Sequence, residues 1–251
     1  MLRKDIRKPS GQATADPAEI ARFEALAEEW WKPNGAFKVV HAFNAVRVAH
    51  LTARLPALVG HAPGDMPLKG KRLLDVGCGA GIVTVPLSRL GADCLGIDAA
   101  EKNVQVAARH AAKTGANVEY RHALPEDLAG EPPFDIVLSL EVIEHVADVR
   151  QFLRALAPLV ASGGVLVIGT LNRTLASYAK AIVGAEYVLG WLPRGTHDWR
   201  KFVKPVEIER GLQPYGFAVL EVAGVSMNPL TMKWGISRDH GVNYLQFLRK
   251  L

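Results

Sequence analysis

The sequence has 251 residues, of which 49% are hydrophobic and 22% charged. This balance excludes a disordered chain and predicts one α/β domain with additions, or two small domains. The net charge of +5 is compatible with binding to a nucleic acid, with binding to a membrane surface, and with the absence of a charged partner. Two cysteines, Cys78 and Cys94, exclude a disulfide framework and a four-cysteine zinc site, so we expect a reducing cytoplasm. No apolar run of about 18 residues occurs, so we expect no membrane-spanning helix.

The N-terminal part of the chain predicts helices. Residues 1–16 are polar and basic, and we expect a flexible tail there. Apolar residues at spacings of three and four from Pro17 to Trp31 predict an amphipathic helix. A second helix is predicted over Phe43–Leu55, before a turn-rich linker. We therefore assign residues 17–68 to a helical cap and residues 69–251 to the main domain.

From Lys71, short β-branched runs alternate with helix-length amphipathic runs, an order that predicts a parallel sheet with helices on both faces. The predicted strands are Arg72–Val76, Asp93–Ile97, Val118–His122, Phe134–Ser139 and Val165–Gly169, and the predicted helices are Ile82–Leu90, Ala100–Thr114 and Asp148–Leu159. An insertion at 171–204 and a helix over Pro205–Leu212 follow. The last two predicted strands, Ala218–Val225 and Val242–Arg249, are joined by a loop too short for a crossover helix, so we expect an antiparallel pair. The whole is a mostly parallel seven-stranded sheet with an antiparallel C-terminal hairpin.

A glycine-rich loop, D-V-G-C-G-A-G at 75–81, joins the first predicted strand to the first sheet helix. Gly77 and Gly79 allow a tight turn and a close approach of a ligand to the backbone. Position 82 is Ile, where a dinucleotide-binding loop needs glycine, so a pyrophosphate cradle is disfavoured. Asp98, at the end of the second strand, can accept hydrogen bonds from both ribose hydroxyls. We predict a nucleotide-like ligand; the alternative is a structural turn with Asp98 capping the next helix.

These motifs and the expected sheet resemble the class I S-adenosylmethionine-dependent methyltransferases, which have a Rossmann-like fold. The resemblance implies that Asp75 and Gly77 line the methionine end of the cofactor, that Gly79 also contacts the cofactor and that Asp98 holds its ribose. Ala123 and Leu124, just after the third strand, would flank the adenine. S-adenosylmethionine is therefore the expected cofactor.

Other segments are similar to the ubiquinone-biosynthesis O-methyltransferases, which methylate hydroxyls on a polyprenylated ring. The segments are the helix ending in Trp30-Trp31, L-E-V-I-E-H-V at 140–146, T-L-N-R at 170–173 with G-A-E-Y at 184–187, and G-T-H-D at 195–198. The likeness covers residues 17–250 and implies that Arg47 and Leu140 also contact the cofactor. An Arg47 guanidinium could pair with the methionine carboxylate, and the alternative is a solvated helix charge. Met227 stands where this family's pattern has tyrosine, which bears on substrate selection.

Glu141, Glu144 and His145 follow the fourth predicted strand, at the edge where ligands bind in open α/β sheets. Their spacing could bring the three side chains together on a helix. They could hold Mg²⁺ or Zn²⁺ with two catechol oxygens, and the family resemblance implies a divalent-metal requirement. Alternatively His145 acts as a general base without metal, or the carboxylates stabilise a helix start above a packed histidine. His197 is a further candidate for lining the acceptor pocket.

Within the 171–204 insertion, six bases and two acids accompany an apolar stripe and nearby aromatic residues. This pattern is typical of a helix that lies on an anionic membrane, and the alternative is a lid whose charges face solvent. The expected partners are a polyprenylated phenol, the inner face of the cytoplasmic membrane and a ubiquinone-biosynthesis complex. A nucleic acid is not expected: the isoelectric point of 9.2 would suit RNA methylation, but no RNA-binding module is recognisable. Two further functions stay open, namely methylation of a different small molecule and noncatalytic binding of S-adenosylmethionine.

Overall fold

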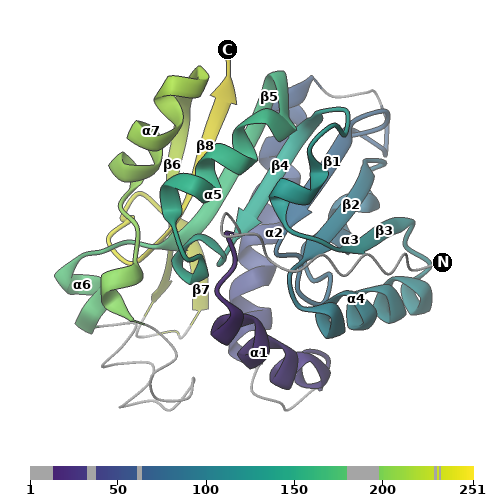
Figure 1. The fold of residues 1–251 in the computed structure, drawn as a ribbon, viewed down its shortest axis with the longest axis horizontal. Helices are drawn as coiled ribbons and strands as arrows, with labels where there is room; N and C mark the ends of the chain where they lie inside the picture. The colour runs from purple at the N-terminus through teal and green to yellow at the C-terminus, as the bar shows by residue number, and fades with distance from the viewer. Residues whose placement is uncertain (1–13, 33–37, 61–63, 180–197, 229–230, 232) are drawn as a thin grey trace.

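The computed structural model describes residues 14–32, 38–60, 64–179, 198–228, 231 and 233–251. Their centre is one sheet with the strand order β3-β2-β1-β4-β5-β8-β6-β7 (Figure 1). The strands are β1 (Arg72–Val76), β2 (Asp93–Asp98), β3 (Val118–His122), β4 (Phe134–Leu140), β5 (Val160–Leu171), β6 (Phe217–Asn228), β7 (Lys233–Ser237) and β8 (Asn243–Lys250). All seven predicted strands are present.

The predicted count of seven is wrong by one, because β7 lies within the segment that we expected to be a loop. β7 pairs only with β6, at the edge of the sheet, and its sequence K-W-G-I-S is short and interrupted by glycine. Such an edge strand carries little of the β-branched pattern that marks a buried one. The predicted change of direction is confirmed: β1 to β5 are parallel, whereas β8 is antiparallel to both β5 and β6.

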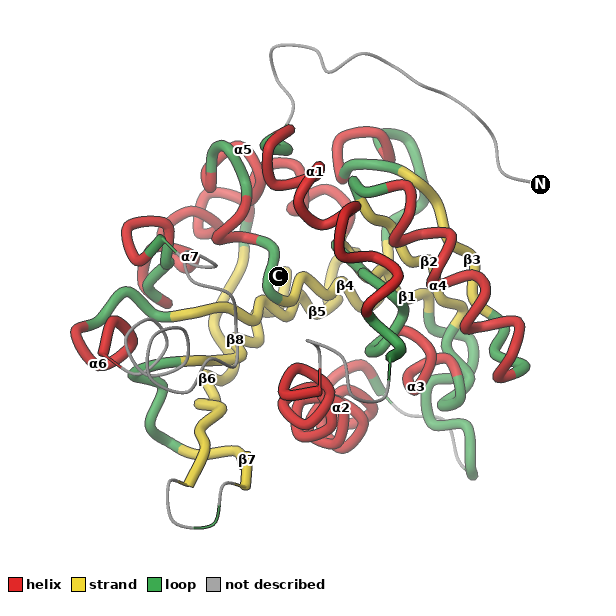
Figure 2. The backbone as a smooth tube through the Cα atoms, turned by 90° about the horizontal axis from the view of Figure 1, so that it is seen from below, coloured by secondary structure: helices red, strands yellow, loops and turns green. Residues whose placement is uncertain are grey.

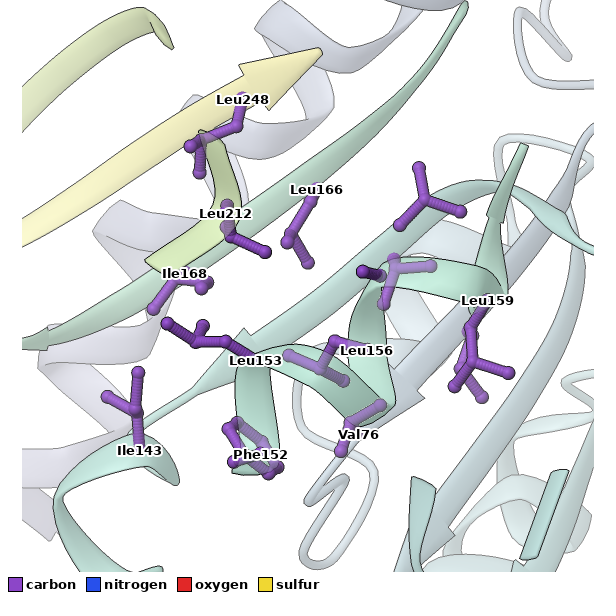
Figure 3. Packing of buried hydrophobic residues seen from close by; sticks show 14 of the residues in the cluster. Val76, Ile143, Phe152, Leu153, Leu156, Leu159, Leu166, Ile168, Leu212 and Leu248 are labelled. Carbon is purple, nitrogen blue, oxygen red and sulfur yellow. The ribbon is translucent and has the colours of Figure 1, made fainter. Parts of the chain in front are cut away.

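Helices cover both faces of the sheet, as predicted (Figure 2). Because the central strands are buried on both sides, neighbouring residues enter different cores: Leu73 packs with α2 and α3, and Leu74 packs with α5 and α7. Figure 3 shows the second of these cores, in which Phe152, Leu153 and Leu156 of α5 are almost fully buried. The longer helices are α1 (Pro17–Leu26), α2 (Lys38–Val59), α3 (Thr84–Ser88), α4 (Glu101–Thr114), α5 (Val149–Leu156) and α7 (Pro205–Leu212).

Short helical segments complete the connections. They are η1 (Ala27–Glu29), η2 (Pro125–Leu128), η3 (Ile143–His145), η4 (Ala157–Leu159), α6 (Leu175–Ser177), η6 (Trp199–Lys201) and η7 (Gln213–Tyr215). The predicted helix over 17–31 is thus α1 continued by a 3-10 turn, and the second cap helix, α2, is longer than predicted. Asp16 caps α1 by accepting a hydrogen bond from the backbone N–H of Ala18 at 3.0 Å.

Residues 14–16, which lead into α1, contact segments that follow β3 and β4. Thr14 is buried, and its N–H donates to a carboxylate oxygen of Glu126 at 2.8 Å. Ala15 forms an isolated antiparallel bridge with Val146. The predicted flexible tail therefore does not extend through residues 14–16, while residues 1–13 lie outside the described part of the chain.

The insertion is described only at its two ends, 171–179 and 198–204, so half of the predicted apolar stripe and His197 lie outside the described residues. In the described part, Leu175 of α6 and Tyr178, which directly follows this helix, have exposed side chains. None of the helices described in the structure is both long enough and apolar enough to span a bilayer.

Candidate active site

The glycine loop follows β1 at the point where the strand order reverses, between β1 and β4. Gly77 and Gly79 have left-handed backbone angles, with φ of 74° and 53°. A Cβ on Gly77 would lie 2.2 Å from the Cγ2 atom of Val142, just after β4. Only glycine permits both this conformation and this close approach. Ligands of open α/β folds bind at such a reversal, so the geometry agrees with the predicted cofactor loop.

Asp98 lies beside this loop and binds it directly. Its Oδ2 accepts a hydrogen bond from the N–H of Gly79 at 2.9 Å. Its Oδ1 accepts bonds from the N–H of Ala100 at 2.8 Å and the side-chain amide of Asn103 at 3.3 Å. Burial raises the pKa of Asp98, and these three donors oppose the rise because they stabilise the ionised form. The structural alternative, a cap at the next helix, is not what the structure has: the N-cap of α4 is Ala100, without a side-chain capping bond, and Asp98 binds the glycine loop instead.

Asp75 is the penultimate residue of β1 and is buried. The hydroxyl of Thr84 in α3 donates a hydrogen bond to its Oδ2 at 2.5 Å. Burial is the main reason that the pKa of Asp75 rises to about 6, with the nearby charge of Asp98 adding to it; the Thr84 bond and the charge of Arg47 oppose the rise. A buried carboxylate with one hydrogen bond is suited to receive a cationic group, such as the amino group at the methionine end of the cofactor.

The remaining predicted cofactor residues lie along the same edge of the sheet. Leu140, the last residue of β4, is almost fully buried. Ala123 and Leu124 follow β3 and are partly exposed, and the N–H of Ala123 donates to the carbonyl of Asp98 at 3.2 Å. The two residues predicted to flank the adenine thus lie next to Asp98, the residue predicted to hold the ribose.

Arg47 reaches the site from α2, and the alternative of a solvated helix charge is wrong. The residue is 3% exposed, and its guanidinium donates to Glu141 Oε1 at 2.7 Å and to Asn44 Oδ1 at 3.1 Å. It also stacks over the ring of Phe43, 4.1 Å from the centroid. Glu141 thus occupies the partner position that we expected for the methionine carboxylate, and the cofactor carboxylate would share this guanidinium with it.

Glu141, Glu144 and His145 do not form one three-residue cluster: the charges of Glu141 and Glu144 influence each other and Arg47, whereas His145 turns to a different partner. Glu141 has a left-handed φ of 58°, the only positive value at a non-glycine residue in the described ranges, and it directs its side chain to Arg47. Glu144 is buried, and its Oε2 accepts a bond from the Thr170 hydroxyl at 2.8 Å. The Nδ1 of His145 lies 3.1 Å from Glu19 Oε2 of α1. The cause is local: η3 is a 3-10 turn of three residues rather than an α-helix, so residue i+4 does not align with residue i.

This arrangement does not fit the predicted metal site. Across the described ranges, no three His, Cys, Asp or Glu side chains are grouped so that they could hold a metal ion. The expectation of a Glu141–Glu144–His145 ligand set is corrected accordingly, and we assign no step to a metal. The two carboxylates do interact electrostatically: burial, together with the charge of Glu141, raises the pKa of Glu144 well above its usual range.

Four functional neighbours were missed in the sequence. Thr84 supports Asp75, Asn103 supports Asp98, and Thr170 supports Glu144. Glu19 binds His145 from a helix 126 residues away in the chain. The first three stand near predicted motifs, but no spacing rule marks them, and a contact between such distant residues has no local signal.

Comparison with known proteins identifies the family. A family model for a methyltransferase domain matches residues 45–222. The chain is 49% identical over 244 residues to the ubiquinone biosynthesis O-methyltransferase of Parvibaculum lavamentivorans, covering 96% of each chain. The protein of the same name from Azorhizobium caulinodans is 49% identical over 238 residues, covering 94% of each chain. The chain belongs to the ubiquinone biosynthesis O-methyltransferase family.

Solved structures agree with this membership at the level of the fold. Magnesium protoporphyrin IX methyltransferase from Synechocystis, with bound S-adenosylhomocysteine, has a TM-score of 0.65 at 19% identity and covers 92% of this chain and 95% of its own. An N-methyltransferase from Bradyrhizobium japonicum, also in complex with S-adenosylhomocysteine, has a TM-score of 0.60 at 16% identity, covering 93% and 97%. The predicted class I fold is confirmed. As a member of this O-methyltransferase family, the protein is an S-adenosylmethionine-dependent methyltransferase.

Proposed function

We propose that this enzyme transfers the methyl group of S-adenosylmethionine to a phenolic hydroxyl of a polyprenylated catechol or hydroxyphenol in ubiquinone biosynthesis. The observation that carries the proposal is the extent of the likeness. The 49% identity to the Parvibaculum protein extends over 96% of the chain, beyond the domain model at 45–222. It therefore includes the N-terminal helices and the C-terminal strands, which lie outside the cofactor motifs.

In this proposal, the residues along the ends of β1, β2 and β4 bind the cofactor. Asp98 accepts the ribose hydroxyls, and Ala123 and Leu124 flank the adenine. Asp75 and the glycine loop receive the methionine end, with Arg47 near its carboxylate. These roles rest on the positions and hydrogen bonds of the side chains at the sheet edge. Alignment of the methyl group with the acceptor oxygen is then a matter of positioning.

His145 is the base that we propose for the phenolic proton. As the O–CH₃ bond forms, the S–CH₃ bond breaks with its electron pair left on sulfur, which gives S-adenosylhomocysteine, and the proton passes to the imidazole. Glu19 lies 3.1 Å from Nδ1 of this ring, and Phe23 packs edge-on against it at 5.1 Å. A carboxylate at one ring nitrogen fixes the ring orientation and stabilises the imidazolium that forms.

The test is transfer of labelled methyl to a short-chain polyprenyl catechol, with tRNA as the control acceptor. We expect labelled catechol and unlabelled tRNA. Asp98→Ala should bind S-adenosylhomocysteine about 10² to 10⁴-fold more weakly, the equivalent of two charge-assisted hydrogen bonds. Label on tRNA and none on the catechol would favour RNA methylation. Cofactor binding without transfer to any phenol would favour a noncatalytic partner.

His145→Ala should lower the turnover rate by about 10²-fold or more, with little change in the affinity for S-adenosylhomocysteine. The matched control is His240→Ala, at an exposed histidine in the loop before β8 whose Nδ1 lies 3.2 Å from the carbonyl of Arg238. An unchanged turnover rate in the His145 variant would remove the proposed base.

We further propose that α6 and the tyrosine that follows it contribute to contact with an anionic membrane, where the polyprenyl substrate resides. Leu175 is 83% exposed and Tyr178 is 49% exposed. The charge contribution is smaller than the sequence indicated, because several of the bases are paired within the protein. These pairs are Arg173 with Glu207, Arg200 with Asp198, and Lys201 with Glu19 and Asp16.

Sedimentation with phosphatidylglycerol vesicles tests this contact. The double variant Leu175→Ser/Tyr178→Ser should bind more weakly than the wild type, since each change removes apolar area from the contact. Leu220→Ser, at an exposed leucine of β6, serves as the control and should bind normally. Equal binding by the wild type and the double variant would contradict the proposal.

A further inference from the structure

Trp30 lies against the cofactor loop, although no cofactor motif includes it. It directly follows η1, and the Cζ2 atom of its ring is 3.4 Å from the position that a Cβ on Gly79 would occupy. The ring is half-buried and packs on Ala27, Ala80 and Val106. Trp30 therefore joins the N-terminal helix to the loop through direct van der Waals contact.

The polar end of the same side chain extends to the ribose-binding carboxylate. The Nε1–H of Trp30 donates to Oδ1 of Asn103 at 3.3 Å, and Nδ2 of Asn103 donates to Oδ1 of Asp98 at 3.3 Å. Asn103 is 2% exposed. An indole N–H can only donate, so it requires the oxygen of the Asn103 amide to face it. This leaves the NH₂ group directed at Asp98, the one orientation that favours an ionised carboxylate.

The neighbouring tryptophan has a different task. Trp31 stacks on His110 of α4, with ring centroids 3.6 Å apart and planes at 12°. It holds the end of the N-terminal segment against α4. Of the two adjacent tryptophans, Trp30 contacts the glycine loop and Trp31 contacts a helix surface. Trp31 is therefore a suitable control for substitutions of Trp30.

We propose that Trp30 is a positioning residue of the cofactor site, which covers the glycine loop at Gly79 and, through Asn103, holds Asp98 in the orientation that receives the ribose. The inference rests on the proposed role of Asp98. Trp30 acts through its neighbours, so its loss should weaken the cofactor complex rather than abolish it. Loss of one oriented hydrogen bond to a charged group corresponds to about tenfold in affinity.

Titration calorimetry with S-adenosylhomocysteine provides the test. Trp30→Phe keeps a ring but removes the donor, and should weaken binding about tenfold. The cofactor KM should rise with the acceptor KM unchanged, a split that general loss of structure would not produce. Trp31→Phe should bind within about twofold of the wild type. Intrinsic fluorescence gives a second readout: the ligand-induced change should be lost in Trp30→Phe and kept in Trp31→Phe.

Asn103→Ala tests the link from its other end and keeps the inference testable if Trp30→Phe does not fold. It should weaken binding to a similar extent, and Trp30→Phe in the Asn103→Ala background should add little, because both changes break one chain of contacts. Normal binding by both single variants would overturn the inference. Asp98→Ala separates the outcomes: if it also binds normally, the assignment of the ribose to Asp98 is wrong, whereas if it loses binding, only the role of Trp30 fails.

Discussion

The ionised carboxylate of Asp75 should lower the free energy of unfolding of the ligand-free enzyme, and the substitution Asp75→Asn should remove this destabilisation. Burial raises the pKa of Asp75 from an ordinary 3.8 to about 6. At about 1.4 kcal/mol per pKa unit, this corresponds to about 3 kcal/mol of destabilisation when the carboxylate is ionised. Asparagine has nearly the same shape, remains neutral and keeps an oxygen for the Thr84 hydroxyl, so it resembles the protonated acid.

The pH dependence follows from the sign of the shift. Between pH 3.8 and about 6 the folded protein binds a proton at Asp75 that the unfolded chain has lost, so stability from this group rises as the pH falls through that window. Below the window both states are protonated and the cost disappears. The Asp75→Asn variant should therefore be more stable than the wild type by up to about 3 kcal/mol at pH 8, with a gap that narrows below pH 6.

Urea denaturation followed by circular dichroism at pH 8, 6 and 4.5 measures this gap. Asp93→Asn, at the exposed first residue of β2, is the control and should change the unfolding free energy by less than about 0.5 kcal/mol. A variant that is no more stable than the wild type at pH 8, or a gap that widens as the pH falls, would refute the reasoning. The Asp75 carboxylate should favour ligand binding in return. S-adenosylhomocysteine should therefore stabilise the wild type more than the variant, since only the wild type offers a negative charge to the amino group of the ligand.

Backbone conformation and burial predict two more changes in stability. Gly77→Ala should destabilise by more than Gly115→Ala: both have left-handed backbones and incur about 1 to 2 kcal/mol of strain, but only the Gly77 Cβ would overlap Val142. Equal unfolding free energies for the two variants would contradict this. Glu144→Gln should raise the unfolding free energy at pH 8, because burial raises the pKa of Glu144 and glutamine carries no charge. Greater stability of the wild type at pH 8 would show that the carboxylate is stabilised by contacts beyond the Thr170 hydroxyl.

Much of the geometry of the candidate cofactor site could be predicted because it follows from local rules. The glycines at 77 and 79 stand between a buried strand and a helix, and the structure gives both the positive φ that the pattern requires. Asp98 was placed by its position at the end of a strand, and parallel strands end at one edge of a sheet. These predictions need only the period of the hydrophobic residues and the chemistry of a turn.

The cluster after β4 could not be predicted in the same way. Its spacing suggested convergence, but the left-handed backbone at Glu141 and the short η3 turn send the side chains to separate partners. Those partners are distant in sequence: Arg47 is 94 residues from Glu141, and Glu19 is 126 residues from His145. The spacing of residues within one segment does not predict which distant segment will pack against it.

By itself, the sequence determined seven of the eight strands of the described sheet, the main helices, the glycine loop and the family resemblance, because hydrophobic period, turn chemistry and motif identity are properties of neighbouring residues. Only the tertiary structure decided where charged side chains point: Arg47 to Glu141, His145 to Glu19, and Trp30 through Asn103 to Asp98. The physical reason is that a buried polar group must find a partner wherever packing brings one within about 3 Å. That choice depends on how the N-terminal helices lie across the sheet edge.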